Sequence, residues 1–180
     1  MLLFCPFSGR PLLRPLRSGL MALLLLSGRP AVHAQQPAPA GVEVSGAGLA
    51  HPTRLSPAQL ARLPHRQVVR PDHDGRKRTY SGVALAAVLA AAGAKPGADL
   101  PRKGMTHYLL ASAADGYQAV FALAELDPAF TSRTVLLADR CDGKPLPKAA
   151  GPYQIIVSDE KKMGRCVRQV QALRVLAAQP

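Results

Sequence analysis

Residues that could bind a metal ion form one short cluster of acidic and histidine side chains. Asp72, His73 and Asp74 are consecutive, and mixed carboxylate and imidazole ligands can hold a divalent cation. The cluster lacks the acidic residue at the twelfth position of a calcium loop. It also lacks the paired cysteine or histidine spacing that is typical of zinc, and His65 could join it only if the intervening strand folds back. We therefore predict a hydrogen-bonded turn here and no metal site.

Motifs for nucleophilic or hydrolytic catalysis are absent from the sequence. There is no G-x-S-x-G elbow, no H-E-x-x-H zinc motif and no phosphate-binding P-loop. Ser81 precedes Gly82, but the flanking glycines of a strand-to-helix elbow do not surround it. These observations lead us to expect no catalytic residue of these classes.

The first 34 residues have the layout of a secretory signal peptide. A basic region with Arg10, Arg14 and Arg17 precedes a short apolar segment, Gly19–Leu26, and a small-x-small pattern ends at Ala34. No adjacent arginine pair precedes the apolar segment, so the twin-arginine export route is not indicated. We predict a Sec-type signal peptide over residues 1–34, cleaved after Ala34, and a periplasmic or secreted protein. The Pro/Ala-rich segment 35–41 is predicted to be a disordered spacer.

Two cysteines, Cys141 and Cys166, remain after this predicted cleavage because Cys5 lies in the leader. An oxidising compartment allows a disulfide to persist. If the two segments meet, the cross-link would stabilise the fold by about 3 kcal/mol on the loop-entropy model. A redox-active site would need a Cys-x-x-Cys pair or a lone activated thiol, and neither pattern is present. We therefore predict a structural disulfide between them.

The chain is basic, with 23 Lys and Arg against 11 Asp and Glu. Four arginines lie in the predicted leader, so 23 − 4 = 19 basic residues would remain against 11 acidic ones, a net charge of +8. The basic residues are scattered without interleaved aromatic residues, which argues against nucleic acid as a partner. No apolar run approaches the roughly 20 residues that span a bilayer, so stable membrane insertion is not expected. A small anionic ligand or a periplasmic protein fits this charge best.

Short strands and a few short helices predict a single α+β domain over residues 42–177, with a mixed or mostly antiparallel sheet. Ser56 and Gln59 form a capping-box pattern that begins a helix, and Pro64 ends it. The Ala/Leu/Val-rich segment Val83–Ala92 predicts a helix that stops at Gly93. Strands are expected at 42–44, 67–70, 108–113, 118–121, 135–138 and 153–157, and the segment 167–176 is expected to return to the core. A charged loop is expected at 71–78, a helical turn at 123–126 and a loop at 142–147.

Four motifs in this order resemble the sulfite-oxidase-type, oxidoreductase molybdopterin-binding domain family. They are Tyr80-Ser81-Gly82-Val83-Ala84-Leu85, Ala114-Asp115-Gly116-Tyr117, the block from Leu136 through Asp142-Gly143-Lys144-Pro145-Leu146 to Gly151-Pro152-Tyr153, and Gly164-Arg165-Cys166-Val167-Arg168. The resemblance covers almost the whole region 42–177. It implies a sulfite-oxidase-type fold with a mixed sheet and a few short helices.

The sequence departs from that family at the position that holds the metal. Family members that transfer oxygen bind molybdenum through a Cys thiolate between the first helix and the Y/W-x-G-V element, and no other side chain supplies equivalent sulfur donation. Residues 66–79 contain no Cys, and Val68, Val69 and Arg70 occupy the expected place. We therefore expect a domain without molybdenum. A molybdopterin-dependent oxidoreductase with non-Cys coordination remains the alternative.

The resemblance also implies where a ligand would bind. Arg165 and Arg168 match family positions near the pterin phosphate, and Tyr117 matches a turn beside the cofactor cleft. A guanidinium group can hold phosphate, sulfate or carboxylate through two parallel hydrogen bonds. We predict an anion-binding cleft formed by Arg165, Arg168, Tyr117, His73 and Arg78. Alternatively, the arginines are solvated, Tyr117 packs across a hairpin, and side chains close the cleft.

Overall fold

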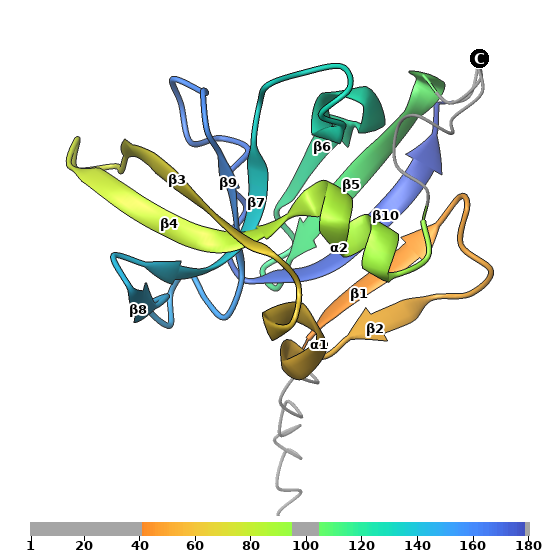
Figure 1. Cartoon of the computed structure of the whole chain (residues 1–180), viewed down its shortest axis with the longest axis horizontal. Helices are drawn as coiled ribbons and strands as arrows, with labels where there is room; N and C mark the ends of the chain where they lie inside the picture. The colour runs from red at the N-terminus through yellow and green to blue at the C-terminus, as the bar shows by residue number, and fades with distance from the viewer. Residues whose placement is uncertain (1–40, 95–104, 179–180) are drawn as a thin grey trace, which may run out of the picture. The chain divides into compact units, whose positions relative to one another are not determined.

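The computed structural model describes residues 41–94 and 105–178, all of which belong to one compact unit (Figure 1). The leader, its cleavage site and nearly all of the predicted spacer lie outside the described residues. Among the described residues, no helix is long and apolar enough to cross a membrane.

Ten strands form two five-stranded sheets. The first sheet has the order β2 (Thr53–Leu55), β1 (Val42–Gly46), β10 (Val170–Ala177), β5 (His107–Ala113) and β6 (Gln118–Ala122). The second has the order β3 (His65–Pro71), β4 (Lys77–Ala84), β7 (Val135–Cys141) and β8 (Lys144–Pro145), with β9 (Gln154–Val157) also paired to β7. Every strand pair is antiparallel except β1 with β10. The predicted α+β class with a mostly antiparallel sheet is confirmed.

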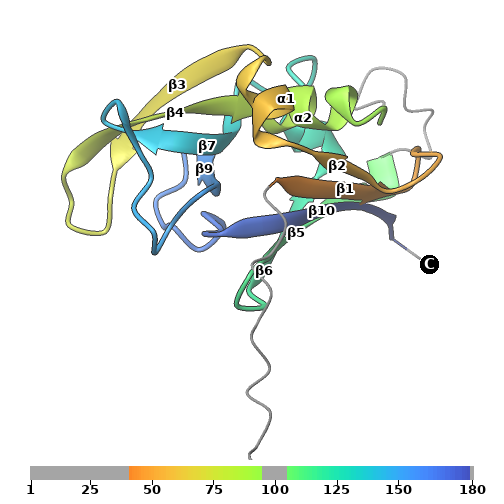
Figure 2. The same ribbon diagram turned by 90° about the horizontal axis from the view of Figure 1, so that it is seen from below.

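Helices α1 (Pro57–Ala61) and α2 (Leu85–Ala91) lie on the same side of the first sheet (Figure 2). The capping box of α1 forms as predicted: the Ser56 hydroxyl accepts from the Gln59 amide, and the Gln59 side chain accepts from the Ser56 amide. Helix α2 begins two residues later than predicted because β4 continues through Ala84. It stops at Gly93, whose φ of +93° is favourable only for a residue without a Cβ.

The main hydrophobic core packs the first sheet against α2 and against buried residues of β4, β7 and β9, and the 3₁₀ helix η2 (Leu123–Leu126) contributes to it. Its largest fully buried side chains include Phe121, Leu109, Leu173, Leu85 and Leu89. A smaller cluster in the second sheet contains Val68, Tyr80, Leu136, Ala138, Ile156 and Cys166. Because the second cluster is small, polar side chains around Tyr80 lie close to the edge of that sheet's packed region.

Gly82 allows β4 and β7 to approach each other closely. A Cβ at this position would lie 2.2 Å from the carbonyl oxygen of Leu137, and the β4–β7 register shifts between Ser81 and Gly82. This close approach leaves no room for a Cβ, which explains why a glycine follows Tyr80-Ser81. Beyond the irregularity, Tyr80 pairs with Cys141, so both residues lie at the same end of the strand pair.

The segment predicted as a loop after β7 begins with a tight hairpin. Asp142 and Gly143 have φ values of +51° and +76°, as in a two-residue type I′ turn, and Cys141 pairs with Lys144 across it. The Asp142 carboxylate accepts from the Thr79 amide at 2.9 Å, which ties the hairpin to β4. The turn thereby fixes the end of the β7–β8 hairpin against β4 and forms one wall of a cavity.

Candidate functional site

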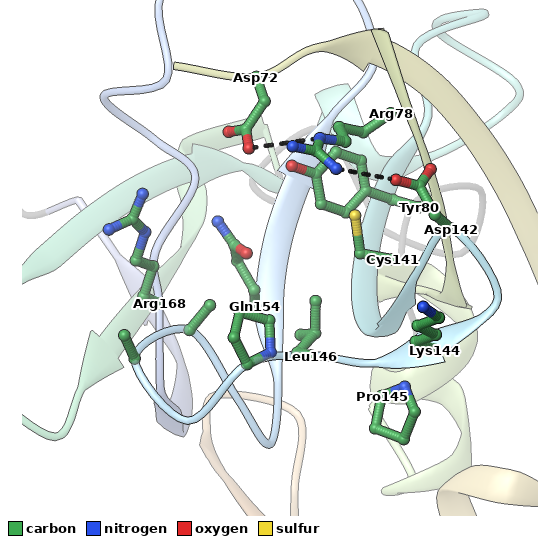
Figure 3. A pocket seen from close by; sticks show the side chains of 13 residues that line it. Asp72, Arg78, Tyr80, Cys141, Asp142, Lys144, Pro145, Leu146, Gln154 and Arg168 are labelled. Carbon is green, nitrogen blue, oxygen red and sulfur yellow. Dashed lines mark hydrogen bonds and ion pairs between the residues drawn. The ribbon is translucent and has the colours of Figure 1, made fainter. Parts of the chain in front are cut away.

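A cavity of about 530 Å³ lies beside the β7–β8 hairpin, and we call it the Gln154 pocket (Figure 3). Its walls come from β4, β7, β8, the start of β9 and the segments that precede β9 and β10. It is lined by Asp72, Arg78, Tyr80, Cys141, Asp142, Lys144, Pro145, Leu146, Pro147, Ala149, Ala150, Gln154 and Arg168.

Gln154 is the buried polar side chain of this pocket. The residue is only 3% exposed, and its side-chain amide points into the cavity (Figure 3). It has no hydrogen-bond partner among the residues that the structure describes. The amide therefore offers its donors and its acceptor to whatever fills the cavity, which favours a ligand that carries a polar group.

Lys144 and Arg168 supply positive charge that the described residues do not neutralise. Both are exposed, both line the pocket, and neither forms an ion pair or side-chain hydrogen bond within 41–94 and 105–178. Arg78 is different because it lies 3.2 Å from Asp142 and 3.3 Å from Asp74. Its Nε atom is buried without a hydrogen bond and faces Asp72 at 4.0 Å. Two of the three cations in the lining are therefore available to a ligand.

The pocket also contains two groups that are held in their neutral forms. Burial raises the pKa of the Tyr80 hydroxyl, and the nearby Asp72 carboxylate adds to this shift. Burial likewise raises the pKa of the Cys141 thiol, and the charge of Asp142 acts in the same direction. The lining thus combines neutral hydrogen-bonding groups with cationic side chains.

Arg165 lies outside the pocket, and its guanidinium is occupied by carboxylates. Its Nη1 and Nη2 contact the Glu125 carboxylate at 2.7 and 3.1 Å, and Nε contacts Glu160 at 2.6 Å. The guanidinium also lies over the Phe121 ring, 4.7 Å from its centre. These contacts raise the pKa of Arg165, chiefly through the Glu125 hydrogen bonds. The residue joins distant segments rather than facing the cavity.

Tyr117 and His73 also lie outside the Gln154 pocket. The Tyr117 hydroxyl donates to the Gly164 carbonyl at 2.5 Å, which ties the β5–β6 hairpin to the segment before β10. His73 lines a separate cavity of about 330 Å³ together with Arg70 and Glu160. Of the five predicted ligand-binding residues, the structure therefore brings only Arg78 and Arg168 together.

Sequence reasoning did not identify Gln154, Lys144 and Cys141 as lining residues of one pocket. The sequence predicted a loop over 142–147 and not a two-residue hairpin, and that hairpin is what places Lys144 opposite Cys141. Gln154 gave one usable signal: it is a polar residue that directly precedes the apolar run Ile155-Ile156-Val157.

The predicted disulfide is wrong in this structure, because Cys141 and Cys166 are both free. Each thiol has its own surroundings. Cys166 is buried and accepts from Nη1 of Arg70 at 3.3 Å, whereas Cys141 lies at the end of β7 in the wall of the Gln154 pocket. The stabilisation expected from a cross-link must come from packing and ion pairs instead.

The residues at the family's metal position do not fit thiolate-bound molybdenum. Arg70 occupies this stretch, is 4% exposed, and donates to the carbonyls of Val157 at 2.5 Å and Glu160 at 3.1 Å. A buried guanidinium offers no lone pair to a metal and repels a cation. Across the described ranges, no three His, Cys, Asp or Glu side chains gather as they would around a metal ion.

The fold is similar to those of solved structures that include the sulfane dehydrogenase SoxCD from Paracoccus pantotrophus. The TM-score is 0.58 at 17% sequence identity, and the match covers 77% of this chain and 38% of that chain. This chain thus spans well under half of the length of that sulfite-oxidase-like protein. No known family model matches the sequence, and no curated protein matches it.

This likeness defines the class of fold. The chain has the α+β fold of the sulfite-oxidase type, as the sequence motifs predicted. At 17% identity the relation is a distant one of fold.

Proposed function

We propose that this domain is a binding module that holds a small anionic ligand in the Gln154 pocket without molybdenum. The observation that carries the proposal is the amide of the buried residue Gln154, which faces the same pocket as the Arg168 cation and, like it, has no partner among the described residues. We further propose that the protein acts in the periplasm or outside the cell, because its first 34 residues have the layout of a leader.

The charges of the lining favour an anion. Asp72 and Asp142 are both directed at Arg78, so the acidic side chains of the pocket have a cation partner already. Lys144 and Arg168 remain as positive groups, and a carboxylate, phosphate or sulfate would pair with either. A cationic ligand would instead have to compete with Arg78 for the two aspartates.

The size and chemistry of the pocket suit a small organic molecule. Ligand pockets typically enclose about 300–1,000 Å³ and combine apolar walls with a few directed polar groups. Here Pro145, Leu146 and Pro147 supply apolar surface, and Gln154 supplies one amide donor pair and one acceptor. A ligand that carries an acidic group and a hydrogen-bonding group would satisfy both.

A molybdopterin-dependent oxidoreductase with non-Cys coordination is the second candidate, and the fold similarity to SoxCD favours it. The contacts of Arg70 argue against thiolate-bound molybdenum at the family's metal position. Elemental analysis and pterin fluorescence of the natively purified protein separate the candidates. Stoichiometric molybdenum with pterin would support the enzyme and overturn the metal-free binding module.

The test of the binding module is a thermal-shift and calorimetric screen with acetate, succinate, phosphate and sulfate. A ligand at a hundredfold excess over its dissociation constant stabilises a fold by about 2.7 kcal/mol. Arg168→Ala should weaken binding about threefold to fivefold, as expected for an exposed charge pair, and leave the melting temperature unchanged. Arg174→Ala, on an exposed position of β10 outside the pocket, is the matched control. Equal affinities for the two variants would remove the proposal.

A further inference from the structure

The Gln154 pocket contains a free thiol within reach of a bound ligand. Cys141 is half-buried, lines the cavity and forms no disulfide. In Figure 3 its sulfur and the amide of Gln154 lie between Arg168 on one side of the pocket and Lys144 on the other. A nucleophilic atom and two cationic groups therefore line the same pocket.

The second cysteine shows that this placement is specific to Cys141. Cys166 is 6% exposed, belongs to the hydrophobic cluster of the second sheet, and accepts a hydrogen bond from the buried guanidinium of Arg70. It lines none of the pockets described above. Only Cys141 of these two thiols is in a position to react with a bound molecule.

We propose that Cys141 is a site of thiol–disulfide exchange with small disulfides that carry a carboxylate on each side of the sulfur pair. This inference rests on the proposed anion-binding function of the pocket. One carboxylate would pair with Arg168 and the other with Lys144, which brings the central disulfide to Cys141. Gln154 would donate to or accept from a polar group of the same ligand.

The exchange is balanced without any further reagent. The Cys141 thiolate attacks one sulfur of the ligand, a new sulfur–sulfur bond forms, and the ligand's own disulfide bond breaks. The departing half leaves as a thiolate and takes up the proton that Cys141 released. Cys141 is oxidised to a mixed disulfide, and half of the ligand is reduced to a thiol.

The surroundings of Cys141 set the speed of this reaction. The Asp142 and Asp72 carboxylates disfavour its thiolate, whereas the Arg78 guanidinium favours it. The thiolate fraction is therefore small at neutral pH, and the exchange is expected to be slow there and faster in alkali. The effect of ligand charge on the exchange rate should therefore be measured at one fixed pH.

The experiment compares three disulfides of similar size and different charge on the purified protein. Dithiodipropionate is dianionic, bis(hydroxyethyl) disulfide is neutral and cystamine is dicationic. Intact-mass spectrometry follows adduct formation, and peptide mapping distinguishes Cys141 from Cys166 and Cys5. We expect the adduct on Cys141, with the dianionic reagent fastest and the dicationic reagent slowest.

The Arg168→Ala variant tests the role of the pocket. It should slow the reaction with dithiodipropionate about threefold to fivefold and leave the neutral reagent unaffected, because one exposed charge pair is lost. Arg174→Ala should change neither rate. An adduct on Cys166 instead, no adduct on Cys141, or a charge preference that is undiminished in Arg168→Ala would overturn the inference.

A further variant separates this inference from the proposed function. Cys141→Ser retains the anion-binding side chains and cannot form a mixed disulfide. If it binds succinate in an Arg168-dependent manner while the unsubstituted protein forms no adduct, the binding function stands and the exchange site fails. If neither protein binds anions, the binding function fails as well.

Discussion

Arg165 and Glu125 form a two-point ion pair, with Nη1–Oε1 and Nη2–Oε2 distances of 2.7 and 3.1 Å. The pair joins η2 to the segment that precedes β10, which lies 40 residues further along the chain. Arg133 contacts the same carboxylate at 2.6 Å. Two guanidinium groups thus share one carboxylate, and the network holds three distant segments together.

Replacing Arg165 should therefore affect stability more than ligand binding. Arg165→Ala would leave Glu160 without its ion-pair partner and Glu125 with Arg133 alone, and we expect a loss of about 1–3 kcal/mol in the free energy of unfolding. Urea denaturation measures this loss, and Arg174→Ala should change it by less than about 0.5 kcal/mol. Unchanged stability together with lost anion binding would instead assign Arg165 to the ligand.

The same network makes stability depend on pH through Glu125. Burial alone would raise the pKa of this carboxyl, but the hydrogen bonds and charge of Arg165, the Ala122 amide and the Arg133 hydrogen bond together outweigh burial and lower the pKa below its ordinary value of 4.5. A carboxyl with a lowered pKa stabilises the fold above its unfolded-state pKa, and this contribution is lost as the pH falls through the folded-state pKa. Glu125→Gln should therefore be less stable than the unsubstituted protein at neutral pH, and the difference should shrink below about pH 4.5. A constant difference across the acid range would contradict this.

The close approach of β4 and β7 predicts a large effect at Gly82. Gly82→Ala places a methyl group 2.2 Å from a backbone carbonyl oxygen, so the strands must separate. We expect a loss on the order of 3 kcal/mol, measured by thermal or urea unfolding. Gly164→Ala is the matched control, because a Cβ at that position has no atom within 4 Å. Similar losses for both variants would show that the strand contact is not the cause.

Replacing Gln154 should weaken ligand binding without reducing the stability of the fold. Gln154→Met keeps the length of the side chain and removes the buried amide that has no partner in the described part of the chain. The protein should be about as stable as before, because the substitution breaks no hydrogen bond to the described residues. Binding of the anions identified by the screen should weaken. Calorimetry and thermal unfolding on the same sample measure both effects. Reduced stability of Gln154→Met with unchanged affinity for the anion would contradict this prediction.

Local signals in the sequence predicted most of the elements. The capping box at Ser56, the Asp-Gly turn between β5 and β6, and the glycine after α2 each fix the backbone through nearby residues, and all three form. The predicted start of α2 was wrong because β4 remains paired with β7 through Ala84. Local propensity does not encode this pairing between distant segments.

The candidate site was predicted less well because its members come from distant segments. Arg168 and Arg78 could be identified as cations, and both lie in the pocket. Arg165 has the same chemistry in the sequence, yet Glu125 and Glu160 occupy its donors. Only the tertiary structure distinguishes an arginine with carboxylate partners from one that faces a cavity.

Strand β10 lies between β1 and β5, so the first strand of the domain is hydrogen-bonded to the last. Until residues 170–177 have been synthesised, the β1–β2 hairpin has no central strand to pair with, and Val42 and Val44 of β1 lack the strand that completes their sheet. The first sheet therefore cannot close before β10 is available.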